Sequence, residues 1–294
     1  MSRNAKISLG LTYLIGALLG LFVLAAHADL PDDWDGKLLK GEPESDFSTN
    51  MPPLMGTKGA LHGKPLAARA GPMVTHDIMI LYTQAALTQH GQAGIDKLVQ
   101  RVVDDANAAY VASRVNITVR LVDKGLAPIA ESGGGTCKTL ETFRNNKSVI
   151  DRRNYAKADF GMLLSMDTGT YIGCASLYII NGVVDAFDVM KTKAIANKTG
   201  THELGHLNGI SHNIENTNQT PAFPWGYGYR YCALTATEGF RDVMCYACPS
   251  GTRAPRYNFF GNPDIDFKGR PTGTQQADAA QALNDNAAYV ATYR

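Results

Sequence analysis

Net charge is almost absent from this sequence, which limits the kinds of partner it can have. Its 28 Lys and Arg residues nearly balance its 27 Asp and Glu residues, so the formal net charge is +1 over 294 residues. Such a chain creates no long-range field that would attract nucleic acid or an anionic membrane. We therefore expect no nucleic-acid partner. Any partner should be recognised by a local site rather than by overall charge.

Long apolar runs are absent after the N-terminus, so no later segment is expected to span a membrane. The one such run, residues 9–26, follows Arg3 and Lys6 and ends in Ala-His-Ala at 26–28. This arrangement predicts a signal peptide, residues 1–28, that is cleaved after Ala28. Because the run is somewhat long, an uncleaved anchor is the alternative. We expect a secreted protein, extracellular or periplasmic, with no stable membrane partner if the signal is cleaved.

Cysteine is scarce, and in an exported protein its five residues indicate disulfides rather than redox catalysis. The CYAC stretch has no second C-x-x-C, which a structural zinc knuckle would need. The odd count leaves at least one cysteine unpaired within the chain. Spacing does not determine connectivity. We expect Cys232 to pair with Cys248, with Cys137 and Cys174 as a second candidate pair, which leaves Cys245 free.

Regular patterning is missing from residues 29–71, which are rich in Pro, Gly and acidic residues. This composition predicts an irregular leader, either a linker or a removable propeptide that blocks a site. The rest of the chain has no internal repeat, and 45% of all residues are hydrophobic, enough for a substantial core. We expect one domain over residues 72–294, acting as a monomer.

Within that domain, short apolar or alternating runs predict strands at 76–83, 115–126, 158–166, 174–180 and 186–192. Helices are expected at 93–114, whose apolar residues recur at three- and four-residue steps, at 139–153, and in the Ala-rich segment 275–294. Strands and helices thus alternate before the strands gather in a group. This order predicts an α/β fold, a mixed twisted sheet packed with helices.

Histidine is also scarce, yet three of the seven histidines fall within the stretch THELGHLNGISHN. His202 and His206 are four residues apart, so on a helix both can face one point. Glu203 is rotated by about 100° from His202, which places its carboxylate beside a bound metal rather than on it. This H-E-x-x-H spacing is typical of zinc proteases.

A third ligand is available from the extension of this motif. Gly209 allows the chain to leave the helix in a conformation that other residues resist. The turn can then bring His212 back to the same metal. Three protein ligands and one open position are typical of catalytic rather than structural zinc. The alternative is an ordinary amphipathic helix with incidental histidines, which the fixed offsets of Gly209 and His212 disfavour.

With these residues the sequence resembles the metzincins. The resemblance implies an active-site helix, a glycine turn and a downstream Met-turn, for which Met244 in RDVMCYACP is the candidate. The segments HDIMILYT and VNITVRLV and the C-terminal tail are similar to reprolysin-like enzymes, nearest to the bacterial peptidyl-Asp metalloendopeptidase type. Astacins and serralysins carry a tyrosine two residues after this methionine, which implies a catalytic role for Tyr246.

The sequence departs from this family at two places. Reprolysins usually have aspartate directly after the third histidine, where this chain has Asn213. Many relatives silence zinc with a propeptide cysteine, but no cysteine precedes Cys137. A leader carboxylate could occupy the zinc instead, since carboxylates are competent ligands. The candidates are Asp32, Asp33, Asp35 and Asp46.

The resemblance implies a secreted endopeptidase with one Zn²⁺ and polypeptide substrates. Glu203 would act as general base on a zinc-activated water, and Met244 would support the histidines from beneath. The alternative is a zinc-containing secreted binding or adhesion module without turnover. The resemblance also suggests an acidic residue beside the scissile bond. Four arginines could line a pocket for it: Arg230, Arg241, Arg253 and Arg256. Surface solvation is the alternative and explains these arginines equally well.

Overall fold

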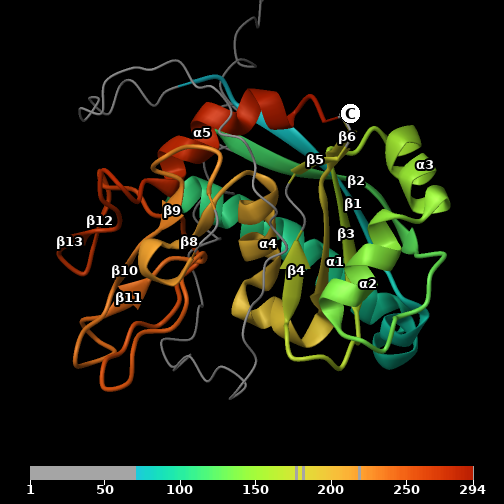
Figure 1. Cartoon of the computed structure of the whole chain (residues 1–294), viewed down its shortest axis with the longest axis horizontal. Coiled ribbons are helices and arrows are strands. Elements are labelled where there is room, and N and C mark those ends of the chain that lie inside the picture. Colours follow the sequence, from blue (N-terminus) through green and yellow to red (C-terminus); the bar gives the residue numbers. More distant parts are fainter. Residues whose placement is uncertain (1–70, 176–177, 181–182, 218–219, 294) are drawn as a thin grey trace, which may run out of the picture. The chain divides into compact units, whose positions relative to one another are not determined.

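A five-stranded sheet organises the computed structural model, which describes residues 71–175, 178–180, 183–217 and 220–293 (Figure 1). The strand order is β2-β1-β3-β7-β4. Four strands are parallel, and β4 runs antiparallel to β7 at one edge. The bounds of the strands are β1 Val74–Tyr82, β2 Ile117–Leu126, β3 Phe160–Ser165, β4 Gly173–Ala175 and β7 Phe187–Lys191. The expected α/β class is therefore confirmed.

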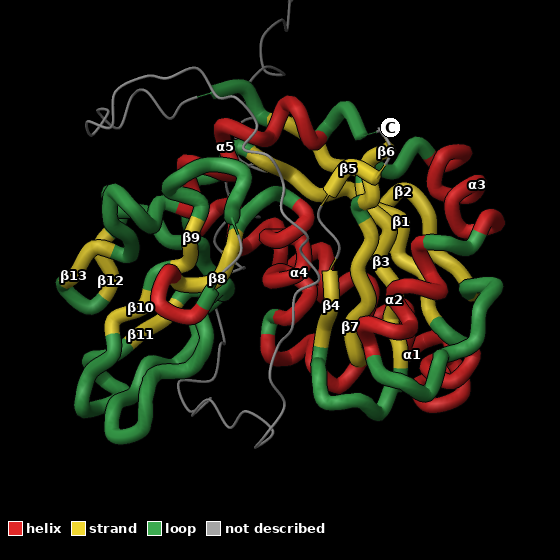
Figure 2. Tube along the Cα trace, viewed as in Figure 1, coloured by secondary structure: helices red, strands yellow, loops and turns green. Residues whose placement is uncertain are grey.

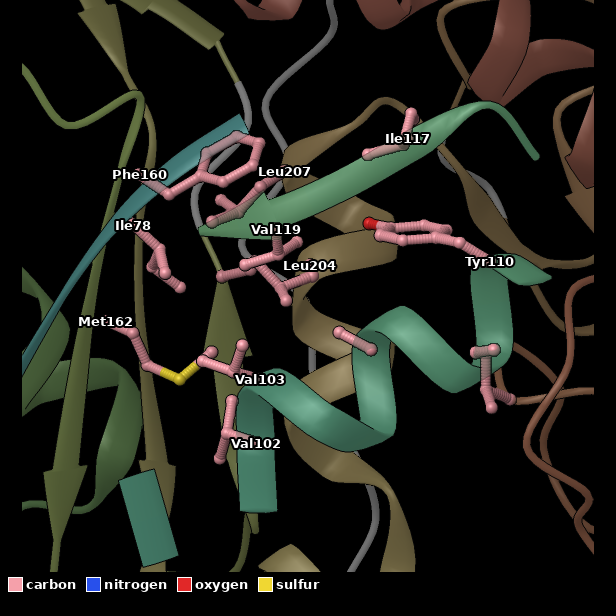
Figure 3. Close-up of a cluster of buried hydrophobic side chains, with 14 of the residues drawn as sticks. Ile78, Val102, Val103, Tyr110, Ile117, Val119, Phe160, Met162, Leu204 and Leu207 are labelled. Atoms are coloured by element: carbon pink, nitrogen blue, oxygen red, sulfur yellow. The ribbon is translucent and has the colours of Figure 1, made fainter. Parts of the chain in front are cut away.

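Helices cover both faces of the sheet. Successive residues of a strand point to opposite faces, and in β1 the residues on both faces are apolar. Ile78 and Ile80 of β1 belong to one core cluster, and Met79 and Leu81 to the other. The first cluster packs beneath α1 (Gln84–Ala112) and α4 (Thr199–Leu207) (Figure 3). The second lies under α2 (Thr136–Arg144) and α3 (Lys147–Ala156).

Three helices and one strand differ from the sequence prediction. The strand expected at 174–180 is divided, since β4 ends at Ala175 and the strand Tyr178–Ile180 belongs to a separate two-stranded sheet. The C-terminal helix covers Ala279–Val290 rather than 275–294. The prediction of a single helix at 139–153 is wrong, because α2 ends at Arg144 and a second helix, α3, begins at Lys147. The Asn146 side chain accepts a hydrogen bond from the Val149 N–H at 3.2 Å, so it caps a new helix. The helix α1 starts nine residues earlier than expected, at Gln84, and is kinked at Gly91 where φ is 63°.

The chain beyond α4 is mostly loop, with short two-stranded ladders (Figure 2). The strands there are β8 Ser211–Asn213, β9 Tyr227–Gly228, β10 Arg230–Tyr231, β11 Phe240–Arg241, β12 Asp266–Phe267 and β13 Arg270–Pro271. The final helix is α5, Ala279–Val290. The other elements are the hairpin β5 Tyr178–Ile180 and β6 Val183–Asp185, and the 3-10 turns η3 Thr192–Asn197 and η4 Ile214–Asn216.

Two disulfides brace these parts. Cys137 of α2 is bonded to Cys174 of the edge strand β4, and Cys232 to Cys248 in the loop-rich segment. These are the pairs that the sequence analysis favoured. Cys245 is buried and forms no disulfide. The Cys232–Cys248 bond therefore closes a short loop around the segment that contains Met244.

The N-terminal predictions lie outside the described residues. These are the signal peptide at 1–28, the leader at 29–71 except for Gly71, and the four candidate aspartates within the leader. Among the residues that the structure describes, no helix has both the length and the apolar character needed to cross a bilayer.

Candidate metal and catalytic site

The helix α4 places His202 and His206 on one side, one turn apart. Both side chains are at least 98% buried, and their Nε2 atoms are 2.9 Å from each other. The helix packs on the edge of the sheet formed by β7 and β4 (Figure 1). Residues four apart share a helix face, so the sequence spacing is sufficient to bring these two rings together.

A glycine turn ends α4 and returns the chain to the histidines. Gly209 has a φ of 90°, Ile210 N–H donates to the Gly205 carbonyl at 3.0 Å, and Gly209 N–H donates to the His206 carbonyl at 2.8 Å. These two bonds form a Schellman motif. The chain then enters β8, where His212 places its Nε2 atom 3.3 Å from that of His202. The structure thus brings all three predicted histidines together.

The Nδ1 atoms of the first two histidines are held by backbone carbonyls. His202 Nδ1 lies 2.7 Å from the Val243 oxygen, and His206 Nδ1 lies 2.8 Å from the Ile210 oxygen. A neutral imidazole that donates from Nδ1 has a lone pair on Nε2. Two such Nε2 lone pairs face each other across 2.9 Å and repel, unless a cation lies among them. The candidate ligand atoms of the three histidines all lie within 4.8 Å of one another, so the arrangement fits a metal ion.

Glu203 points to the edge strand instead of joining the histidines. It is fully buried, and a Cβ atom added to Gly173 of β4 would overlap its Oε1 atom. Gly173 therefore leaves the space that the carboxylate occupies. Sequence reasoning missed this residue, because nothing near Gly173 in the chain marks it. Only the packing of β4 against α4 reveals its role.

A tight turn lies beneath the histidines and contains Met244. Its side chain is fully buried, and a Cβ atom on Gly205 of α4 would overlap the Met244 sulfur. Methionine is thus packed against the turn of α4 that separates the first two histidines. The preceding residue, Val243, supplies the carbonyl that holds His202.

The carboxylate of Asp242 organises this turn. Oδ1 accepts a hydrogen bond from Met244 N–H, and Oδ2 accepts from Tyr229 and Gly261 N–H, all at 2.9–3.0 Å. Burial raises the pKa of Asp242 to about 6, although these hydrogen bonds oppose the shift. The sequence analysis did not identify Asp242. An aspartate two residues before the methionine was an available signal, since Asp commonly bonds the backbone two residues on.

Tyr246 and Asn213 are the neighbours of the third histidine, His212. The Tyr246 ring centroid is 4.1 Å from that of His212. Tyr246 N–H donates to Asn213 Oδ1 at 3.1 Å. The residue after the third histidine therefore ties the Met244 turn to β8.

Comparison with known proteins agrees with this geometry. The Reprolysin_5 model, described as Metallo-peptidase family M12, matches residues 74–258. The chain belongs to this M12 metallopeptidase family. The matched residues include all three histidines, Glu203 and Met244, and a family of metallopeptidases is in keeping with a three-histidine cation site.

Relatives of this M12 chain come from bacteria. It is 33% identical over 240 residues to a "Peptidyl-Asp metalloendopeptidase" of Xanthomonas campestris pv. campestris, covering 79% of this chain and 55% of the relative. It is 31% identical over 252 residues to a protein of that name from Pseudomonas aeruginosa, covering 78% and 41%. The chain thus spans about half the length of these relatives or less.

One solved structure supports the fold of this M12 chain. It is described as "Structure of a chaperone-substrate complex" and has a TM-score of 0.58 at 17% identity. The match covers 75% of this chain and 36% of that chain. At this identity the likeness concerns the fold alone.

The four candidate arginines of the M12 chain have different surroundings. Arg241 and Arg256 are at least 95% buried, and both donate to the carbonyl oxygen of Cys245. They brace the backbone after Met244. Arg253 is exposed. Arg230 donates to the carbonyl oxygens of Tyr246 and Ala247, and its Nη2 lies 3.9 Å from the Glu215 carboxylate. Arg230 therefore lies beside both the Tyr246 segment and a carboxylate.

Proposed function

We propose that this chain is a zinc-dependent endopeptidase. The observation that carries the proposal is the convergence of three Nε2 atoms, with the buried Glu203 carboxylate on the same helix. Ligands of a tetrahedral Zn²⁺ at about 2.0–2.1 Å lie roughly 3.3 Å apart. The separations of 2.9 and 3.3 Å between the Nε2 atoms are close to this value. We assign His202, His206 and His212 as the zinc ligands.

The residues around the ligands have separate roles in this proposal. A zinc ion bound there would acidify a water molecule and polarise the peptide carbonyl. Glu203 accepts the proton as water attacks the carbonyl and passes it to the leaving amine. Gly209 and Met244 position the histidines from the end of α4 and from beneath it. The hydroxyl of Tyr246, whose ring packs on His212, donates a hydrogen bond to the carbonyl oxygen as negative charge develops there.

Peptide cleavage next to aspartate is the proposed specificity. It is supported by the name of the relatives, "Peptidyl-Asp metalloendopeptidase", with which the chain shares 31–33% identity. A positively charged side chain near the histidines is the complement that an aspartate needs. Arg230 is positioned to provide it.

Export and processing belong to the same proposal. Residues 1–28 would direct export, and residues 29–71 would form a leader that is removed from a monomeric catalytic domain, residues 72–294. We expect N-terminal sequencing of secreted, active protein to give a start near residue 72. A start at Asp29 in fully active protein contradicts the removal of the leader.

Casein hydrolysis with and without a chelator tests the enzyme itself. We expect chelation to abolish cleavage and added zinc to restore it, because the histidines alone provide no nucleophile. Metal analysis of the restored protein should give one zinc ion per chain. If fully zinc-loaded protein cleaves neither casein nor Asp-containing peptides, the chain is a binding module and the proposal is wrong.

A further inference from the structure

A carboxylate already lies in a small polar niche beside the third histidine. Glu215 Oε2 accepts a hydrogen bond from Asn213 Nδ2 at 2.7 Å and lies 3.9 Å from Arg230 Nη2. Burial opposes ionisation of Glu215, yet the Asn213 hydrogen bond and the Arg230 charge leave its pKa below the usual value. The side chain of Glu215 is 69% exposed, whereas that of Arg230 is 8% exposed. The niche thus contains a nearly buried guanidinium, and the exposed Glu215 carboxylate lies over it at the surface.

This niche is close to the proposed zinc ligands. Asn213 directly follows His212 in β8 and is 99% buried. Arg230 donates to the carbonyl oxygen of Tyr246, whose ring packs on His212. A side chain held by Asn213 and Arg230 therefore belongs to a residue near the bond that the metal site would cleave.

The orientation of the Asn213 amide makes the niche selective for an acceptor. Its Oδ1 accepts from Tyr246 N–H, so its Nδ2 faces away, toward Glu215 and the Asn216 side-chain oxygen. An aspartate at this position, usual in reprolysins, could also accept from Tyr246. It would then present a second carboxylate oxygen where Asn213 presents N–H donors, and it would repel an acidic ligand.

Arg230 supplies charge in a poorly hydrated place. Two main-chain carbonyls hold Nη1, which directs the guanidinium plane and reduces the entropy lost when a carboxylate binds. A charge so little exposed interacts more strongly with a carboxylate than a surface arginine does. A neutral amide in the same place would leave the guanidinium poorly compensated.

We propose that Asn213 and Arg230 form the subsite for the aspartate side chain of the substrate, and that Glu215 occupies it when no substrate is bound. The incoming carboxylate displaces Glu215, whose exposed side chain moves into solvent. The inference rests on the proposed peptidase function. It makes Asn213, the departure from the family pattern, a specificity-determining residue.

The test compares two amidated peptides that differ in one residue. One contains a single aspartate, and the other has asparagine at that position. Amidation ensures that the side chain is the only carboxylate. We expect wild-type protein to cleave beside aspartate with the higher kcat/KM. Asn213→Asp and Arg230→Gln should each lower the Asp-to-Asn ratio of kcat/KM by about tenfold or more, with zinc content unchanged. Arg120→Gln, which removes an exposed arginine of β2 that pairs with Asp77 of β1, should leave the ratio unchanged.

Glu215→Gln provides an independent arm, since an exposed position tolerates the change. Without the competing carboxylate, KM for the aspartate peptide should fall about threefold or more. This arm decides the outcome if the Arg230 and Asn213 variants fail to fold. An unchanged ratio in folded Asn213→Asp and Arg230→Gln, or an unchanged KM in Glu215→Gln, overturns the inference. If wild-type protein cleaves neither peptide, the proposed function itself has failed.

Discussion

At the scale of single residues, the site keeps Glu203 apart from the three histidines. The three histidines turn their Nε2 atoms to one point, whereas Glu203 turns to the edge strand and fills the space left by Gly173. A residue that transfers protons without binding the metal can be removed while the metal stays. This division gives each kind of variant a different expected phenotype.

We expect Glu203→Ala to retain wild-type zinc content and to lose at least about a hundredfold in kcat, the usual range for a general base. His206→Ala should instead lower the zinc content itself. Metal analysis and peptide kinetics on the same preparations distinguish the two. Near-normal kcat in zinc-loaded Glu203→Ala would rule out its role as base.

Tyr246 is the second residue whose chemistry can be isolated. We expect Tyr246→Phe, which keeps the ring on His212 and removes the hydroxyl, to lower kcat at least about tenfold with little change in KM. That pattern indicates an interaction made only in the transition state. If kcat stays within about twofold of wild type, Tyr246 only packs against His212.

At the scale of elements, the end of α4 determines where the third histidine lies. The Schellman motif at Gly209 turns the chain, and the Ile210 carbonyl in that turn also holds His206. The turn of Asp242 to Cys245 supports the same helix from below through Met244. The geometry of the site therefore depends on two turns as much as on the helix.

We expect Gly209→Ala to destabilise the protein by at least about 1–2 kcal/mol and to weaken zinc binding. The new side chain is strained at φ 90°, and its Cβ would lie 2.5 Å from the Ala222 Cβ. Gly251→Ala is the matched control, because Gly251 has the same φ of 90° with nothing within 4 Å. It should show the backbone strain alone and full zinc content. Equal zinc affinity in both variants would contradict a role for Gly209 in placing His212.

At the scale of the whole molecule, a buried histidine links the sheet to the C-terminal helix. His76 of β1 is fully buried, and its Nε2 lies 2.9 Å from the Ala287 carbonyl in α5. Burial lowers the pKa of His76 to about 4, against the opposing effects of that carbonyl and of Asp77. The ring is therefore neutral at pH 7 and donates from Nε2.

This shift predicts acid sensitivity with a defined direction. The unfolded state, with a pKa near 6.5, binds the proton more readily than the folded state, so stability falls as pH decreases from about 6.5 toward 4. Between pH 7.5 and 5.0 His76 should account for a loss of about 2 kcal/mol. Urea unfolding of metal-free protein at both pH values measures it. His76→Phe should reduce the loss by about that amount, and an unchanged loss would exclude His76 as the cause.

The sequence by itself determined the parts of the site that depend on local periodicity. Four-residue spacing places His202 and His206 on one helix face, and a glycine is needed where the chain must turn at a positive φ, as at Gly209. The strand at 76–83 and the α/β class followed from apolar runs in the same way. The helix expected at 139–153 failed, because the capping asparagine Asn146 outweighed a periodicity that continues across it.

Only the tertiary structure decided which distant residues meet at that site. Gly173 and Glu203 are 30 residues apart in the sequence, and their fit depends on β4 packing against α4. The four arginines are equivalent as letters, yet folding buries Arg241 and Arg256 against backbone carbonyls, exposes Arg253, and places Arg230 beside Glu215. Contacts of this kind are set by how elements pack, and no spacing within a single segment encodes them.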